Sequence, residues 1–376
     1  MRSRAGQFAF CLAISSVLAL SAQTLGLQVV PRIDLPKDSP VALISADWGG
    51  STASARGGAM IVDLHAALSL RNSTAKRVRG ITLTVVAQEV TPGGKGSLSI
   101  PCLDVGPGEA FPVRLDMRLL RPLQAGGGLP AQIGLDGVLF DDLSFYGPDH
   151  LNSRHTMTVW EMEARRDRRY YKALLEKSGP TVLQNQILAV LAREPERLQV
   201  GMEVARGPAT NVEPGGHDLQ FAFLRFPDSP VEPSDGIAQV AGNEAREPRM
   251  DVRNRSDRPI RYLEIGWILQ DQRGRDFLAG SVPARVTLAP GQRSQVHQDA
   301  AVKFPGRPGQ ALSITGMTGF VNNVEFSDGA VWIPSRAEIQ SAGLESILGP
   351  SPEEQRLVQI YRRKGLQALI AELKKF

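Results

Sequence analysis

An internal repeat constrains the architecture of this chain more than any other feature of its sequence. Residues 68–74 resemble residues 250–256, and residues 99–101 resemble residues 281–283, both at an offset of 182. The same offset relates residues 134–137 to 316–319 and residues 153–154 to 335–336. Several independent matches at one offset indicate a tandem duplication. The sequence therefore predicts two copies of one domain.

The rhythm of apolar residues within each copy predicts short strands joined by turns. Alternation marks residues 61–71, 78–90, 98–105, 111–119 and 133–146 in the first copy, and 260–269, 285–288, 312–326 and 330–333 in the second. Gly and Pro, 37 and 26 in number, occur at the turns between these segments. About seven short strands per copy favour an antiparallel β-sandwich.

One part of the second copy supports a family resemblance. Residues 252–260, the apolar strand that follows, the turn at 271–274 and the segment 288–291 resemble the small immunoglobulin-like modules of secreted bacterial proteins, of the FxLYD or type-2 late-embryogenesis-abundant kind. The resemblance covers about 80 residues of each copy and rests on turn chemistry and strand rhythm. It implies an antiparallel sandwich without catalysis of its own, and no functional residue is transferred by it.

Helices are expected after each sandwich. Residues 156–177 carry apolar side chains at helical spacing and end at Ser178-Gly179-Pro180, and a second helix is expected over 182–192. Ser351 and Glu354 form the pattern of a capping box, and Gly365 should split the helix that follows. The fold class is therefore mainly β with α: two tandem immunoglobulin-like sandwiches, each followed by a helical hairpin. The expected boundaries are 30–153 and 205–335 for the sandwiches, 154–195 for the first hairpin and 336–376 for the C-terminal helices.

The first 22 residues have the pattern of a signal peptide. Arg2 and Arg4 precede an uncharged apolar run over residues 8–20, and Ala19 and Ser21 are small residues of the kind a signal peptidase requires. Cleavage after Ser21 or Ala22 would place the mature protein in the periplasm or outside the cell. An uncleaved anchor is the alternative, but the apolar run is shorter than the roughly 20 residues of a bilayer span. No other stretch approaches that length, so we expect no transmembrane span in the mature chain.

Charge and cysteine content exclude some classes of protein. Loss of residues 1–22 would leave 41 basic and 39 acidic side chains, so the charge indicates no nucleic-acid partner. Of the two cysteines only Cys102 would remain, which rules out an intramolecular disulfide. Each domain should then be stable through its own core, and Trp267 should be buried in one of these cores.

No group of residues has the spacing of a metal, cofactor or catalytic site. The histidines are His65, His150, His155, His217 and His297, and none of their spacings matches a zinc helix. Cys102 is expected to be a small buried residue in a strand. The pair Asp141-Asp142 aligns with Asn322-Asn323 at the offset of 182, which favours a polar turn over acid–base chemistry. Residues 125–128 are rich in glycine but lack the lysine of a phosphate loop.

Three further features have both a functional and a structural interpretation. Arg165, Arg166, Arg168 and Arg169 on one expected helix, and residues 362–364 on another, would suit an anionic surface, but solvated helix faces are the preferred interpretation. Trp160, Trp267 and Trp332 fit a ligand platform or a sandwich core, and the core is preferred. Asn72 and Asn254 match a glycosylation pattern, but their equivalence in the repeat favours a shared strand-end turn.

These observations lead to a non-enzymatic binding or scaffold protein of the cell envelope, with an unknown envelope protein or polysaccharide as its partner and no cofactor. The alternative is an envelope hydrolase with a site in the interdomain cleft. That site would lie around His150 and His155, opposite residues 205–248.

Overall fold

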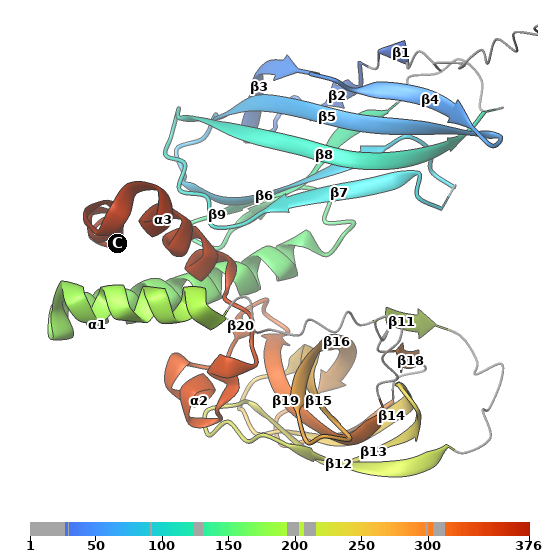
Figure 1. Ribbon diagram of the computed structural model, residues 1–376, viewed down its shortest axis with the longest axis vertical. Helices are drawn as coiled ribbons and strands as arrows, with labels where there is room; N and C mark the ends of the chain where they lie inside the picture. Colours follow the sequence, from blue (N-terminus) through green and yellow to red (C-terminus); the bar gives the residue numbers. More distant parts are fainter. Residues whose placement is uncertain are drawn as a thin grey trace, which may run out of the picture.

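The structure is a computed structural model that describes residues 27–28, 30–90, 92–123, 131–193, 203–206, 216–297, 300–303 and 313–376. Two β bodies lie above and below a set of helices (Figure 1). The expected signal peptide at 1–22 and the glycine-rich residues 125–128 lie outside the described residues. Among the described strands, no sheet contains strands from both bodies.

In the described residues, the first body has two five-stranded sheets. In one sheet the long strand β5 pairs with β8 along one edge and with β3 and β4 along the other, and β1 pairs with β4. In the other sheet β9 and β6 are central, with β7, β10 and the parallel strand β2 beside them. The strands are β1 Leu27–Gln28, β2 Arg32–Asp34, β3 Val41–Asp47, β4 Thr52–Arg56, β5 Ala59–Asn72, β6 Val78–Val86, β7 Lys95–Ile100, β8 Ala110–Pro122, β9 Gln132–Phe140 and β10 Phe145–Tyr146.

Alternation along β5 and β8 explains the core of this body. Side chains at every second position of these strands are buried, and they meet apolar side chains of β6 and β9 in one cluster. The sequence rhythm therefore predicted these strands correctly. The exception is the expected strand over 98–105, because β7 ends at Ile100 and Cys102 lies in the loop beyond it with φ 56°.

As far as the structure describes it, the second body is one hydrogen-bonded system of ten strands. The strand β12 joins its two layers, pairing with β13 at its start and with β19 at its end. Trp267, only 1 % exposed, confirms the expected core position and packs edge-on against Phe221. The strands are β11 Glu203–Arg206, β12 His217–Phe223, β13 Val231–Ala241, β14 Glu244–Asn254, β15 Ile260–Asp271, β16 Asp276–Leu288, β17 Arg293–His297, β18 Ala300–Lys303, β19 Ile314–Phe326 and β20 Val331–Trp332.

The same local contacts occur in both bodies. The amide of Asn72 donates to the carbonyls of Lys76 and Val105, and the amide of Asn254 donates to those of Arg258 and Leu288. Each amide oxygen also accepts two hydrogen bonds from the residue two positions ahead, Thr74 in one case and Ser256 in the other. Both asparagines are fully buried, as the expected strand-end turn requires.

The proposed equivalence of Asp141-Asp142 with Asn322-Asn323 is wrong. Asp142 pairs with Lys76 in the turn after β9, and Asp328 pairs with Arg258 in the turn after β19. Asn323 lies within β19 and donates to Glu264. Extra residues in β19 shift the correspondence by four positions at this point, so a fixed offset of 182 misaligns it.

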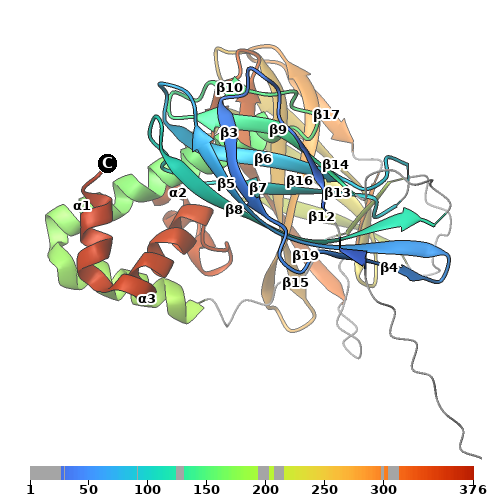
Figure 2. The ribbon, with the colours of Figure 1, turned by 90° about the horizontal axis from the view of Figure 1, so that it is seen from above.

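The described part of the chain has three α-helices and a 3₁₀ turn: α1 Ser153–Arg193, α2 Arg336–Ser341, η1 Leu344–Ser346 and α3 Pro352–Leu373. Gly179 (φ 83°, ψ 176°) interrupts α1, and Gly365 (φ 80°, ψ −179°) interrupts α3, as expected from the sequence. The chain changes direction at both breaks (Figure 2). The predicted capping box at Ser351 and Glu354 is present. Apolar side chains on both segments of α1 and α3 share one buried cluster.

The first turns of α1 contact both β bodies. Asp136 on β9 accepts hydrogen bonds from the backbone N–H of His150 and from the hydroxyl of Ser153. The His155 ring lies 2.9 Å from Glu325 on β19 of the other body.

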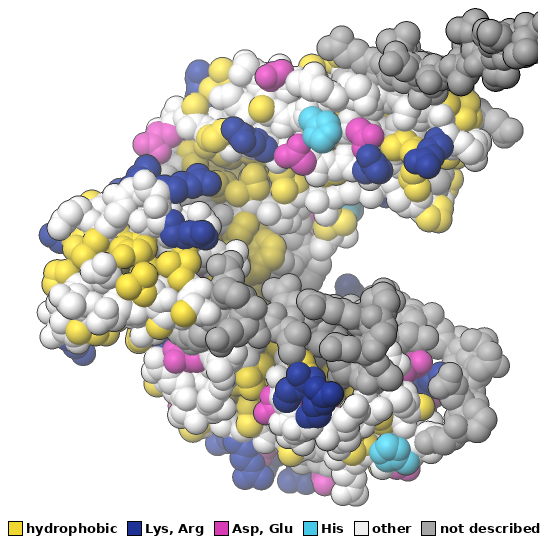
Figure 3. All heavy atoms as spheres, in the orientation of Figure 1, with side chains coloured by type: hydrophobic (Ala, Val, Ile, Leu, Met, Phe, Trp, Pro, Cys, Tyr) yellow, Lys and Arg dark blue, Asp and Glu magenta, His cyan; other side chains and the backbone are white. Residues whose placement is uncertain are grey.

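No helix in the described part of the chain is both long and apolar enough to cross a membrane. On the side away from the helices, open space separates the described surfaces of the two bodies (Figure 3).

Candidate functional site: an arginine-lined groove

A groove with a volume of about 1000 Å³ lies between α1, α2 and the second β body. One wall comes from α1, and the other comes from the turns at residues 227–230 and 255–258. Residues 331–334, which begin with the short strand β20, lie between these walls and lead into α2. The groove therefore depends on how α1 packs against the second body.

Arginine is the characteristic side chain of this groove. Five arginines line it, against two aspartates, Asp228 and Asp257. The arginines are Arg166, Arg169, Arg255, Arg258 and Arg336. Three of the five pair with the carboxylates of Asp167, Asp328 and Glu354, which leaves Arg169 and Arg255 as the groups that would attract an anionic ligand.

The arginines differ in how firmly they are held. Arg336 is only 11 % exposed, and its guanidinium pairs with Glu354 and Glu345, each at 2.9 Å. Arg166 pairs with Asp167 at 3.0 Å and donates to the Pro334 carbonyl. By contrast, Arg169 and Arg255 are exposed and make no ion pair within the described part of the chain. These two are the cations best able to meet a ligand.

Aromatic and proline side chains supply the apolar lining. The Arg336 guanidinium lies 4.8 Å from the centre of the Tyr170 ring, and that of Arg258 lies 4.1 Å from the centre of the Phe326 ring. Trp332 is half-buried: it packs against the core clusters of the second body, as expected, and its remaining surface lines the groove. An apolar surface beside cationic groups suits a ligand that carries both apolar and anionic groups.

A buried set of polar groups supports the groove from behind. Asp167 is fully buried and accepts hydrogen bonds from Arg166 and from the Ser351 hydroxyl at 2.6 Å. Burial raises the pKa of Asp167 by more than Arg166 lowers it. Burial also raises the pKa of Glu354, but Arg336 and the Tyr171 hydroxyl outweigh that effect and hold this pKa below its usual range. Because α1, α2 and α3 all contribute, the helices are fixed relative to each other.

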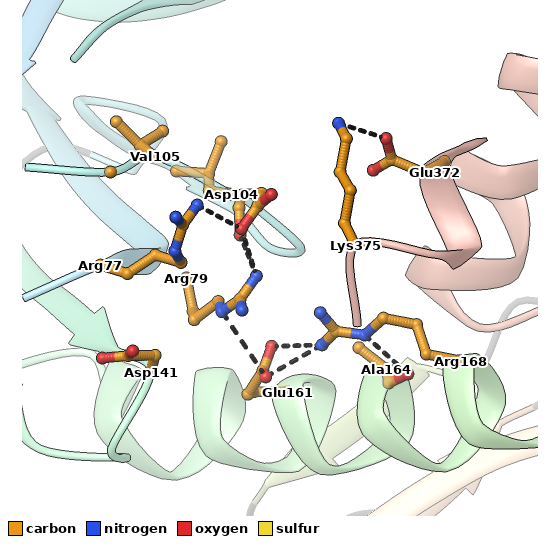
Figure 4. Close-up of polar contacts among 12 residues, drawn as sticks. Arg77, Arg79, Asp104, Val105, Asp141, Glu161, Ala164, Arg168, Glu372 and Lys375 are labelled. Atoms are coloured by element: carbon orange, nitrogen blue, oxygen red, sulfur yellow. Dashed lines mark hydrogen bonds and ion pairs between the residues drawn. The ribbon is translucent and has the colours of Figure 1, made fainter. Parts of the chain in front are cut away.

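A second polar set joins the first body to the helices. Glu161 on α1 lies between Arg79 of β6 and Arg168 (Figure 4). Arg79 also pairs with Asp104 at 2.7 Å, and Arg168 approaches Glu353 of α3 at 3.8 Å. With Arg79 and Arg168 only 11 % and 6 % exposed, these pairs are largely shielded from water. These pairs, together with the contact of His155 on α1 with Glu325 of β19, form a charged framework around α1 that contacts both β bodies.

The histidines do not gather at one place. His155 is buried between Glu325 and the Tyr262 ring, whose centre lies 4.3 Å away, and its Nε2 has no hydrogen-bond partner. His150 is exposed, and so are His65 and His217. His297 ends β17 and is also exposed. Within the described residues, no group of three or more His, Cys, Asp or Glu side chains has a metal-binding arrangement.

Cys102 and the expected acidic pair have structural surroundings. Burial and the neighbouring Glu353 raise the pKa of the Cys102 thiol, which keeps it protonated. Hydrogen bonds from Lys76 and Ser144 hold the pKa of Asp142 below its usual range, as in a turn that ends a strand. Neither group has the surroundings of an activated nucleophile or a general acid.

The basic cluster on α1 divides between the interior and the surface. Arg165 and Arg168 both pair with Glu161, and Arg166 pairs with Asp167. Arg169 is the exposed member. Arg362, Arg363 and Lys364, before the break in α3, are also exposed. This cluster was visible in the sequence. The groove was not, because the residues that line the groove come from four separate segments of the chain.

Comparisons with known proteins add no function. No protein-family model matches this chain, and no curated protein matches it. Among solved structures, red sea bream transglutaminase aligns at a TM-score of 0.13 and 10% identity, covering 75% of this chain and 31% of that one. A β-glucosidase from Kluyveromyces marxianus in complex with glucose aligns at 0.17 and 11% identity, covering 78% of this chain and 48% of that one. The chain spans 31% and 48% of the length of these two structures, and similarities of this size support no argument about fold or function.

Proposed function

We propose that the chain is an exported, non-enzymatic binding or scaffold protein of the cell envelope, built from a duplicated immunoglobulin-like module. The observation that supports a binding role most directly is the groove, where exposed cations lie beside aromatic side chains. The charged framework around α1 is consistent with this role, because a groove between a helix and a β body keeps its shape only if the two cannot move apart.

Recurring contacts support the proposed duplication. The buried asparagines Asn72 and Asn254 make matching hydrogen bonds at a spacing of 182 residues. Glycines with nearly the same backbone angles, Gly179 and Gly365, interrupt the helices that follow the two bodies. Shared contacts of this detail are most simply explained by descent from one ancestral unit.

Affinity capture from an envelope fraction tests the binding role. The bait would be the purified chain, compared with a variant in which Arg169 and Arg255 are both changed to Glu. The control variant carries the same changes at Arg362 and Arg363, which are exposed on α3. We expect the groove variant to lose its captured components and the control to retain them. Equal capture by all three proteins would place binding elsewhere.

Export can be tested separately by cell fractionation and N-terminal sequencing. We expect the protein outside the cytoplasm, with Ala22 or Gln23 as its first residue. A cytoplasmic protein that retains Met1 or Arg2 at its start would contradict the proposed location.

A hydrolase remains the second candidate because of His155. Glu325 could orient the His155 ring, and the unpartnered Nε2 is the atom that a general base would use. A panel of ester, amide and glycoside substrates would test this, with His155→Ala as the control. Turnover that disappears in this variant would overturn the non-enzymatic proposal.

A further inference from the structure

We propose that the groove binds an acidic polypeptide segment in extended conformation, which pairs with the free edge of β20. This inference rests on the proposed binding function and names the class of its partner. It follows from three features of the same groove: two exposed arginines without an ion pair in the described part of the chain, a strand edge without a described strand partner, and apolar side chains between them.

Two exposed arginines lie on opposite walls of the groove. Arg169 projects from α1, and Arg255 belongs to the turn that connects β14 to β15. Neither makes an ion pair within the described part of the chain, whereas Arg166 and Arg336 are held by buried carboxylates. Carboxylates of a ligand can therefore pair with Arg169 and Arg255 without displacing an internal partner.

The strand edge distinguishes a polypeptide from other anionic ligands. In the described structure β20 pairs with β19 alone, through Trp332 with Val324 and Val331 with Glu325. The other edge of β20 has no strand partner there, and residues 331–334 line the groove. An added strand would form hydrogen bonds with the backbone groups of Val331 on that edge. A polysaccharide or a lipid headgroup has no backbone with the matching repeat.

The apolar lining suits the alternate side chains of such a strand. Trp332 and Tyr170 are partly exposed in the groove. Side chains of an extended peptide point in alternate directions, so one set can contact the aromatic rings while acidic residues of the other set reach the arginines. The groove also lies in a concavity between α1 and the second body, which a flat membrane surface would not enter.

The experiment is selection from a displayed library of random dodecapeptides on the immobilised full chain. We expect enrichment of Asp and Glu alternating with apolar residues. The best peptide, labelled with fluorescein, would then be titrated by anisotropy. Changing both Arg169 and Arg255 to Gln should weaken its binding about tenfold or more. The matched change of Arg362 and Arg363 to Gln should leave binding unchanged.

Hydrogen exchange provides a second measurement that does not depend on charge. The bound peptide should slow exchange at the backbone amide of Val331, which faces away from β19, more than at that of Trp332, which pairs with Val324. Polygalacturonate and vesicles containing phosphatidylglycerol serve as competing anionic probes, and neither should displace the peptide at equal charge concentration.

The outcomes separate this inference from the proposed function. An unenriched or non-acidic library, equal binding by the Arg169/Arg255 and Arg362/Arg363 variants, or no protection at Val331 would each overturn the peptide site. These results would leave a non-enzymatic binding role intact. Cleavage of the peptide, detected by mass spectrometry, would instead overturn the non-enzymatic function.

Discussion

Removing the side-chain amide of Asn72 should destabilise the first β body strongly. Its Nδ2 donates one N–H to the Lys76 carbonyl at 2.8 Å and shares the other between the carbonyls of Val105 at 3.1 Å and Gly106 at 3.0 Å, and its Oδ1 accepts from the backbone N–H and the hydroxyl of Thr74. Asn254 makes four bonds of the same kind in the second body. Both side chains are fully buried, so water cannot replace the lost partners.

The magnitude follows from the number of bonds. Each buried hydrogen bond contributes about 1 kcal/mol net, and groups left unpaired in the interior add to the loss. Four bonds therefore predict that Asn72→Ala and Asn254→Ala each lower the free energy of unfolding by about 3–5 kcal/mol. The two variants should agree within about 1 kcal/mol, because their contacts match.

Urea unfolding followed by tryptophan fluorescence measures this change. Trp48 lies in the first body and Trp267 in the core of the second, so both bodies contribute to the signal. The control is Asn185→Ala, an exposed position on α1, which should change stability by less than about 0.5 kcal/mol. A loss below about 1 kcal/mol in either buried variant would refute the reasoning.

Three other predictions concern the helices and the framework around α1. Gly179→Ala and Gly365→Ala should each lower the free energy of unfolding by about 1–3 kcal/mol, because both glycines have backbone angles that residues with a side chain disfavour. The control Gly50→Ala should leave stability unchanged in the same thermal unfolding assay. Arg336→Leu should cost about 3–5 kcal/mol in chemical unfolding because it leaves buried carboxylates without their partner, and a change below 1 kcal/mol would contradict this. Burial raises the pKa of Glu163 to about 7. The unfolded chain therefore loses this proton at a lower pH than the folded chain does. The contribution of Glu163 to the free energy of unfolding is accordingly lost as the pH rises from about 4.5 through 7. Glu163→Gln should accordingly raise the unfolding midpoint at pH 8 and leave it unchanged at pH 4, and an equal shift at both pH values would argue against the assignment.

Local signals were predicted well because they depend on neighbouring residues. The capping box at Ser351 and the helix breaks at Gly179 and Gly365 follow from the chemistry of a few adjacent positions. Trp267 was placed correctly because strand alternation determines which side chains face inward. Cys102 was misplaced because β7 ends two residues earlier, and nothing in the apolar pattern marks that end.

The sequence by itself determined the strands, the helix ends and the repeated turns, since each depends on residues close together in the chain. Only the tertiary structure decided the groove. Arg169, Arg255 and Trp332 lie on separate elements, and they line one groove because α1 packs against the second body through the contact of His155 with Glu325 and the hydrogen bond from Arg166 to the Pro334 carbonyl. Such packing depends on complementary surfaces and shielded charges from distant segments, and no spacing along the chain records which of them will meet.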